Sequence, residues 1–163
     1  MSYTKQEKLH IVTPVAVIRR EDGRILLLKR RDDETVYPGY YTFPGGKMEG
    51  NDTIAETLKK EVKEECDLTL ADGFILIKEK SIGRADGQTS KSLSFLCTAE
   101  NADSVTIDEN DFTDYTWANL DELRSLKHVG IEAEFVKVKA IYDSGCNREV
   151  FFVDTDSVDF RNK

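Results

Sequence analysis

The most constraining feature of the sequence is residues 45–68, where a glycine pair precedes a segment of helical character. Glu61, Glu64 and Glu65 fall on one side of that helix, at about 0°, 300° and 40°, within an arc of roughly 100°. Like charges three and four residues apart destabilise a helix, so the arrangement requires a counterion. Mg²⁺ takes oxygen ligands of this kind and usually shares them with substrate phosphates. The stretch therefore predicts metal-assisted phosphate chemistry.

Composition limits the fold and the partners. With 163 residues, the chain is expected to form a single domain over residues 1–163, with a core at about 10–143 and a C-terminal extension at 144–163. The net charge of -8 argues against long nucleic acids and acidic membranes as partners, because both need a basic surface. A small anionic substrate is compatible with this charge, since a bound divalent cation inverts the local field.

The opening sequence and the cysteines bear on location. The start, MSYTKQEKLH, lacks the apolar core of a signal peptide, and no apolar run approaches membrane-spanning length. A cytoplasmic location is the resulting expectation. Cys66, Cys97 and Cys146 have no metal-ligand spacing and are interpreted as buried or incidental thiols without a catalytic role.

Several apolar runs predict β-strands. Residues 13–20 and 24–30 are joined by Glu-Asp-Gly, which predicts a hairpin. After a loop over residues 31–41, further strands are expected at 42–44, 73–82, 91–98, 115–118 and 150–153. In the 91–98 run, Leu93, Phe95 and Cys97 alternate with Ser92, Ser94 and Leu96, a pattern that is typical of a half-buried strand.

Three helices are also expected. The first begins near Asp52 or Thr53, because Thr53-Ile54-Ala55-Glu56 is a capping-box pattern, and its apolar stripe adjoins the carboxylates. A second capping-box pattern at residues 119–122 predicts a short helix through residue 126. Apolar residues at helical spacing predict a longer helix over residues 131–142.

The glycine and glutamate stretch resembles the Nudix box, whose pattern is G-x(5)-E-x(7)-R-E-U-x-E-E-x-G-U, with U a bulky aliphatic residue. Gly46 takes the first position, and Glu61, Val62, Glu64, Glu65 and Leu68 match. The resemblance extends to Leu-Leu-Lys-Arg, Phe-Pro-Gly-Gly and the Tyr-Thr-Trp run before Leu-Asp-Glu-Leu, and it covers most of residues 12–126. It implies an α+β fold, a Nudix-type α/β/α sandwich with a mixed β-sheet.

Three positions depart from the family pattern. Asp52 stands in place of a glutamate, Lys60 in place of the arginine, and Asp67 in place of the last glycine. The resemblance implies that the arginine orients a catalytic glutamate, and Lys60 keeps the charge but loses the planar, two-pronged geometry. Asp67 tolerates the positive φ that a glycine supplies better than most residues do.

The resemblance implies hydrolysis of a diphosphate bond in a nucleoside diphosphate linked to another group. Mg²⁺, with Mn²⁺ as an alternative, is the implied cofactor, and the implied catalytic residues are Glu61, Glu64 and Lys60. The implied metal ligands are Glu61, Glu64, Glu65 and backbone oxygen at Gly45, and the implied substrate-binding residues are Arg30, Lys47 and Gly46. A small nucleotide is the expected partner, and the resemblance also allows a homodimer.

Other interpretations of these residues stay open. Clustered Glu and Lys commonly form a solvated helix face. Glu109 and Asp111 lie where Nudix enzymes recruit a general base, but their run is also typical of an exposed loop. Tyr37, Tyr40, Tyr41 and Phe43 are candidates either for stacking on a base or for packing.

Alternatives stay open for the substrate and for the presence of enzymatic activity. Residues 80–85 contain neither the proline nor the tyrosine that marks some family subgroups, which favours a nucleoside triphosphate or a nucleotide sugar as substrate. The competing hypothesis is a non-catalytic Nudix-fold sensor of a nucleotide or metabolite, motivated by Lys60 and Asp67. A purely structural acidic module is a third.

Overall fold

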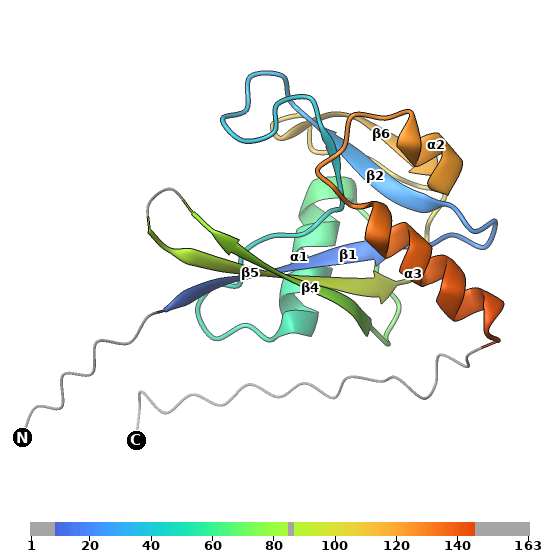
Figure 1. The fold of residues 1–163 in the computed structure, drawn as a ribbon, viewed down its shortest axis with the longest axis horizontal. Coiled ribbons are helices and arrows are strands. Elements are labelled where there is room, and N and C mark those ends of the chain that lie inside the picture. The colour runs from blue at the N-terminus through green and yellow to red at the C-terminus, as the bar shows by residue number, and fades with distance from the viewer. Residues whose placement is uncertain (1–8, 85–86, 146–163) are drawn as a thin grey trace, which may run out of the picture.

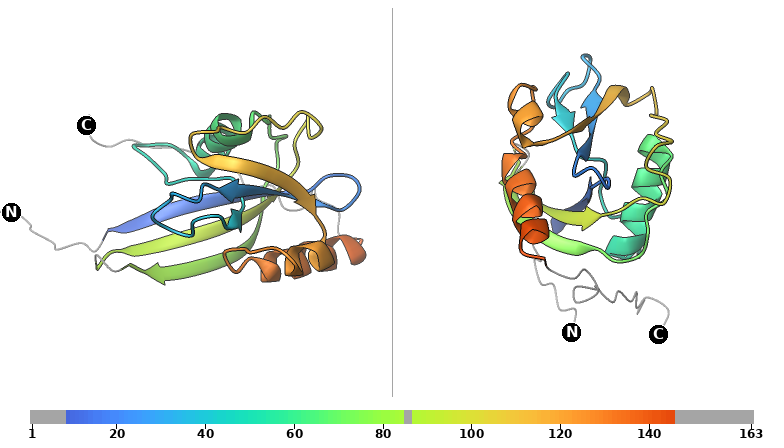
Figure 2. Two further views of the ribbon diagram at one scale, coloured as in Figure 1. Left: turned by 90° about the horizontal axis from the view of Figure 1, so that it is seen from above. Right: turned by 90° about the vertical axis from the view of Figure 1, so that its right-hand side faces the viewer.

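Two three-stranded sheets lie between helices in the computed structural model, which describes residues 9–84 and 87–145 (Figure 1). The first sheet has the order β1 (His10–Ile18), β5 (Thr89–Cys97) and β4 (Ile75–Gly83); the second has the order β3 (Tyr41–Thr42), β2 (Ile25–Arg30) and β6 (Phe112–Ala118). The helices are α1 (Ile54–Cys66), α2 (Leu120–Arg124) and α3 (Glu132–Asp143). Helices α1 and α3 lie on opposite sides of the sheets (Figure 2).

Side-chain alternation along the strands builds one core under each of these helices. On β2, Leu26 and Leu28 enter the core with Leu58 and Val62 of α1, whereas Leu27 enters the core with Phe135 of α3. Both faces of β2 are therefore covered, which explains its continuous apolar run. β1 runs parallel to β5 and β4 runs antiparallel to β5, so the predicted α/β/α sandwich with a mixed sheet is confirmed.

The predicted hairpin over residues 13–30 is wrong. A tight turn forms, with the Arg20 N–H donating to the Arg24 carbonyl at 2.9 Å, but only an isolated bridge links Arg19 to Ile25. Beyond that bridge the two strands enter different sheets, β1 against β5 and β2 against β3 and β6. The Asp-Gly signal describes the local turn, and it carries no information about the distant strands that pair with β1 and β2.

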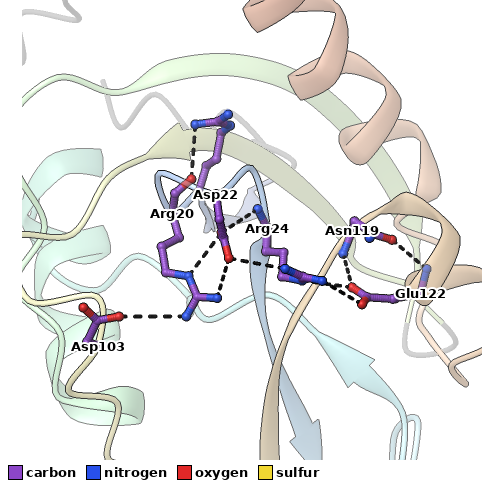
Figure 3. Close-up of polar contacts among 7 residues, drawn as sticks. Arg20, Asp22, Arg24, Asp103, Asn119 and Glu122 are labelled. Carbon is purple, nitrogen blue, oxygen red and sulfur yellow. Dashed lines mark hydrogen bonds and ion pairs between the residues drawn. The ribbon is translucent and has the colours of Figure 1, made fainter.

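The β1–β2 turn is fixed to α2 by a chain of charged contacts (Figure 3). Asp22 accepts hydrogen bonds from Arg20, and the Arg24 guanidinium donates to both carboxylate oxygens of Glu122, at 3.0 and 3.2 Å. Glu122 is also the N3 residue of the capping box whose N-cap is Asn119. The bond from Arg20 holds the pKa of Asp22 well below its usual range.

The remaining predicted elements form with shifted ends. Both capping boxes are present, at Thr53 and at Asn119, and α2 ends at Arg124 instead of residue 126. Cys66 and Cys97 are buried free thiols, as expected, whereas Cys146 and the strand predicted at 150–153 lie outside the described residues. Within the described ranges, none of the helices combines the length and the apolar character needed to cross a membrane.

The first turn of α1 supplies a test of the local structure. Thr53→Ala removes the hydroxyl that accepts from the Glu56 N–H, so we expect the free energy of unfolding in urea to fall by about 1 kcal/mol. Thr35→Ala, in an exposed loop, is the matched control and should change it by less than about 0.5 kcal/mol. Equal effects of the two substitutions would contradict a capping role.

Candidate active site

The glycine pair is held against the outer edge of β1. The Ala16 N–H donates to the Pro44 carbonyl at 2.8 Å, and Gly45 forms an isolated antiparallel bridge with Val15. Gly45 has a φ of +148°, and a Cβ built on it lies 2.5 Å from the Pro14 carbonyl oxygen and 2.6 Å from the Val15 Cα. Only glycine fits this close backbone approach.

Gly46 is in contact with a carboxylate instead. A Cβ built on Gly46 lies 2.3 and 2.7 Å from the two carboxylate oxygens of Glu61. The missing side chain therefore leaves the space in which the Glu61 carboxylate lies. The group that closely approaches this glycine is thus the carboxylate of Glu61 in α1.

Glu65 is tied to the same loop. The Gly45 N–H donates to Glu65 Oε2 at 2.8 Å. Burial, together with the negative charges of Glu61 and Asp111, raises the pKa of Glu65 to about 8, although the Gly45 hydrogen bond and the charge of Arg30 oppose the rise. Glu65 is therefore a carboxyl group close to its titration point in neutral solution.

The three glutamates of the helix face have different environments. Burial and the neighbouring charge of Glu64 raise the pKa of Glu61, which is half-buried. Glu64 itself is exposed, and Glu65 points inward onto the glycine loop. The predicted trio therefore runs from the interior to solvent, and it is not a uniformly solvated face.

Lys60 lies at the exposed edge of this face. Its Nζ is 3.4 Å from Glu49 Oε2, and this bond raises the pKa of Lys60. The hydrogen bond goes to Glu49, while the charges of Glu61 and Glu64 act on Lys60 without a hydrogen bond between them in the structure. The role of Lys60 in orienting Glu61 stays a prediction.

The loop before β6 brings a fourth carboxylate to the cluster. The Asp108 and Thr106 N–H groups donate to the carbonyls of Glu65 and Cys66, at 2.9 and 3.1 Å, which caps the C-terminal end of α1. Asp111 follows in this loop, and its charge raises the pKa of both Glu61 and Glu65. Of the two candidates in this loop, the structure therefore brings Asp111 close to the cluster.

A cavity of about 180 Å³ adjoins the glycine loop on the α3 side of the first sheet. Arg30 lines this cavity, and it donates to the Val36 carbonyl at 2.8 Å and to Glu34 Oε2 at 3.1 Å. Its charge also opposes the rise in the pKa of Glu65. Other lining residues come from β1, from β3 and the loops flanking it, and from β4 and β5; they include Val15, Tyr37, Phe43, Lys80, Ser92 and Ser94. Two larger hollows, of about 450 and 680 Å³, surround the β1–β2 turn and share no lining residue with this cavity.

The carboxylate side chains of the acidic cluster do not converge on a single point. Among residues 9–84 and 87–145, no three His, Cys, Asp or Glu side chains converge closely enough to hold a metal ion. The donors nevertheless are all carboxylate oxygens, and burial together with their mutual repulsion raises the pKa of Glu61 and of Glu65. This chemistry suits a hard divalent cation.

Comparison with known proteins places this arrangement in a family. The family model described as "NUDIX domain" matches residues 9–138. The chain belongs to the Nudix hydrolase family. It is 34% identical over 120 residues to the nucleoside triphosphatase NudI of Salmonella agona, a match covering 68% of this chain and 84% of that protein. The predicted enzyme class, a Nudix pyrophosphohydrolase, is confirmed.

Solved Nudix structures share the fold. A MutT Nudix hydrolase from Burkholderia pseudomallei is 26% identical with a TM-score of 0.66, over 78% of this chain and 98% of that one. The MutT protein of Methanosarcina mazei is 20% identical with a TM-score of 0.65, over 88% of this chain and 100% of that one. The second likeness concerns the fold alone.

The structure brings together some of the predicted site residues. Gly45, Gly46, Glu61 and Glu65 form one contact network, while Glu64 and Lys47 are exposed beside it. Of the aromatic candidates, Tyr37 and Phe43 line the cavity, and Tyr40 and Tyr41 are not among its lining residues.

The sequence pattern of β5 does not indicate that its serine side faces a cavity. Ser92 and Ser94 line the cavity, although their alternation with Leu93 and Phe95 favours a solvent-facing role for the serines. The Nudix resemblance implies a sandwich in which both faces of the sheet are covered. That implication indicates that the serine face beside α3 does not meet solvent.

The two glycines give opposite predictions. Gly45→Ala forces a Cβ into backbone atoms at a positive φ, so we expect a loss of about 2 kcal/mol or more in the free energy of unfolding. Gly46→Ala meets the end of a flexible side chain, so stability should change by less than about 1 kcal/mol while Glu61 is displaced and turnover falls. Urea unfolding and an activity assay of both variants measure this contrast, and an equal loss of stability would contradict it.

The raised pKa of Glu65 predicts a pH-dependent stability in the absence of metal. Folding raises this pKa from an ordinary 4.5 to about 8, so the folded state binds more protons between these values. Stability contributed by the group is therefore present at pH 4.5 and is lost as the pH rises towards 8. We expect the unfolding temperature in EDTA to fall over this window and the Glu65→Gln variant to show a flatter profile. Identical profiles would refute the assignment.

Proposed function

We propose that the chain is a Mg²⁺-dependent hydrolase of nucleoside triphosphates that releases the monophosphate and pyrophosphate. The observation that carries this proposal is the continuity of the site: Phe43 lines the cavity, and two residues later Gly45 donates to Glu65 in the carboxylate cluster. A nucleoside bound in the cavity therefore has its phosphates directed along the loop towards the acidic helix. The nucleoside triphosphatase name of the NudI relative supports the same substrate class.

The residues that would hold Mg²⁺ are Glu61, Glu64 and Glu65, with backbone oxygen of Gly45 as a further ligand. When bound, the ion would neutralise charge on the phosphates and lower the pKa of a bound water. Ionised Glu65 still accepts the Gly45 N–H through one oxygen and has the other oxygen for a ligand role.

The chain's own cations fit the phosphate groups. Arg30 lines the cavity and its charge acts on Glu65, and exposed Lys47 follows the glycine pair directly. Both supply charge-assisted hydrogen bonds to phosphate oxygens. A water oxygen then attacks phosphorus as the bridging P–O bond breaks, with the water proton passing to a carboxylate of the cluster. We take Asp111 as the candidate base in preference to Glu109, because the charge of Asp111 acts on both Glu61 and Glu65.

The non-catalytic sensor is the alternative, and the Lys60–Glu49 contact favours it, because a Lys60 engaged there does not orient Glu61. The two functions differ in turnover and share nucleotide binding. A nucleotide sugar remains the second substrate class, and the same assay includes it.

The test is product release from a panel of nucleoside triphosphates and nucleotide sugars, with Mg²⁺ and with EDTA. We expect Mg²⁺-dependent formation of monophosphate and pyrophosphate, and Glu61→Gln and Glu64→Gln should each lower kcat/KM by about 100-fold or more. Glu100→Gln, an exposed carboxylate remote from the cluster, is the matched control and should keep the parental rate. Binding without metal-dependent turnover across the panel would overturn the hydrolase in favour of the sensor.

A further inference from the structure

Ser94 occupies an unusual position for a polar side chain. It lies in the middle of β5, opposite Val15 of β1 and Lys78 of β4, and only 4% of it is exposed. It is nevertheless one of the residues that line the 180 Å³ cavity. Its hydroxyl is thus a polar group fixed in the buried wall of the proposed nucleoside site.

The Ser94 hydroxyl has a buried partner behind it. Ser94 Oγ donates to Glu134 Oε1 at 3.1 Å, and Glu134, which is 5% exposed, comes from the first turn of α3. Lys78 Nζ lies 3.3 Å from the other oxygen, Glu134 Oε2. As a carboxylate, Glu134 accepts hydrogen bonds from both Lys78 and Ser94, so it fixes the direction of the serine proton.

A serine hydroxyl has one proton and two lone pairs. Since Glu134 takes the proton, the atom left for a ligand is an oxygen that only accepts. An N–H group of a base facing Ser94 finds a partner there, whereas a carbonyl in the same place stays unpaired, and a buried unpaired acceptor is unfavourable.

We infer that Ser94 is a specificity residue for the base and that Glu134 is its positioning residue, together favouring amino-bearing bases over their carbonyl counterparts. The inference rests on the proposed nucleotide site. Two other polar lining residues from β4 and β5 are less constrained: Lys80 is exposed, and Ser92 is half-buried. Ser94 is the one among these three that is buried and hydrogen-bonded to a buried carboxylate.

The test compares CTP with UTP and ATP with ITP, pairs in which a carbonyl replaces one amino group. In the parent protein we expect kcat/KM for the amino member to be about 10-fold higher in the pair that fits the cavity. Ser94→Ala removes the acceptor, so the ratio should fall to within about 2-fold of one. Glu134→Ala frees the serine proton for donation to a carbonyl, so the ratio should fall in the same way. Glu132→Ala, in the same turn of α3 and paired with Arg124, is the control and should keep the parental ratio.

Dissociation constants for the same nucleotides in EDTA separate this inference from the proposed hydrolysis. The inference is overturned, and the hydrolase stays intact, if the parent protein turns over both pairs with a kcat/KM ratio near one. The same holds if the ratio in Ser94→Ala equals that of the parent. An equal loss for all four nucleotides in the two variants indicates packing alone and also overturns it. Binding that favours the amino members without any turnover supports the inference and overturns the hydrolase. If the protein shows neither binding nor turnover, both the inference and the hydrolase are overturned.

Discussion

The contact on which the site depends is the attachment of residues 44–48 to the outer edge of β1. β1 is an edge strand of the first sheet, and such an edge presents unpaired backbone groups. Here Pro44 accepts from Ala16, Gly45 bridges Val15, and the Met48 N–H donates to Val12 at 2.8 Å. An irregular segment therefore takes the place of a neighbouring strand, and the conformation of Gly45 decides whether it fits.

This attachment explains why the site has two halves. Thr42 and Phe43, shortly before the glycines, line the cavity on the α3 side, whereas the glycines themselves contact Glu61 and Glu65 of α1. α1 and α3 lie on opposite sides of the sheets, so residues on the two sides meet only at an open edge (Figure 2). That meeting place is the edge of β1, and the segment that runs along this edge has glycine at two successive positions.

The carboxylates at this edge work against the stability of the fold. Burial and the charges of Glu64 and Asp111 disfavour ionisation of Glu61 and Glu65, so the metal-free protein keeps acidic groups where their charges are poorly solvated. A divalent cation reverses that balance because it interacts most favourably with the ionised groups. The same electrostatic strain that lowers stability thus favours cation binding, in line with the proposed role.

Local patterns were sufficient for the features that depend on local chemistry. Thr53 and Glu56 form the capping box, and Glu61 and Glu65 both contact the glycine loop, because a helix places residues four apart on the same side. Long-range pairing was not accessible in this way. The β1–β2 turn gave a wrong hairpin, and the proximity of Asp111 follows from a loop bonded to the end of α1, which no local pattern encodes.

The serines of β5 show most clearly what a single strand leaves undetermined. Alternation of apolar and polar residues indicates that the two faces differ, but it does not identify the second environment as solvent. In this sandwich both faces are covered, so the polar face meets a cavity at Ser92 and a buried carboxylate at Ser94. A buried serine needs a partner, and Glu134 meets that need from a helix 40 residues further along the chain. Glu134 in turn interrupts the apolar face of α3, and Lys78 compensates its charge. The polar residues of β4, β5 and α3 are therefore explained together by the cavity wall, and none of them is explained by its own element.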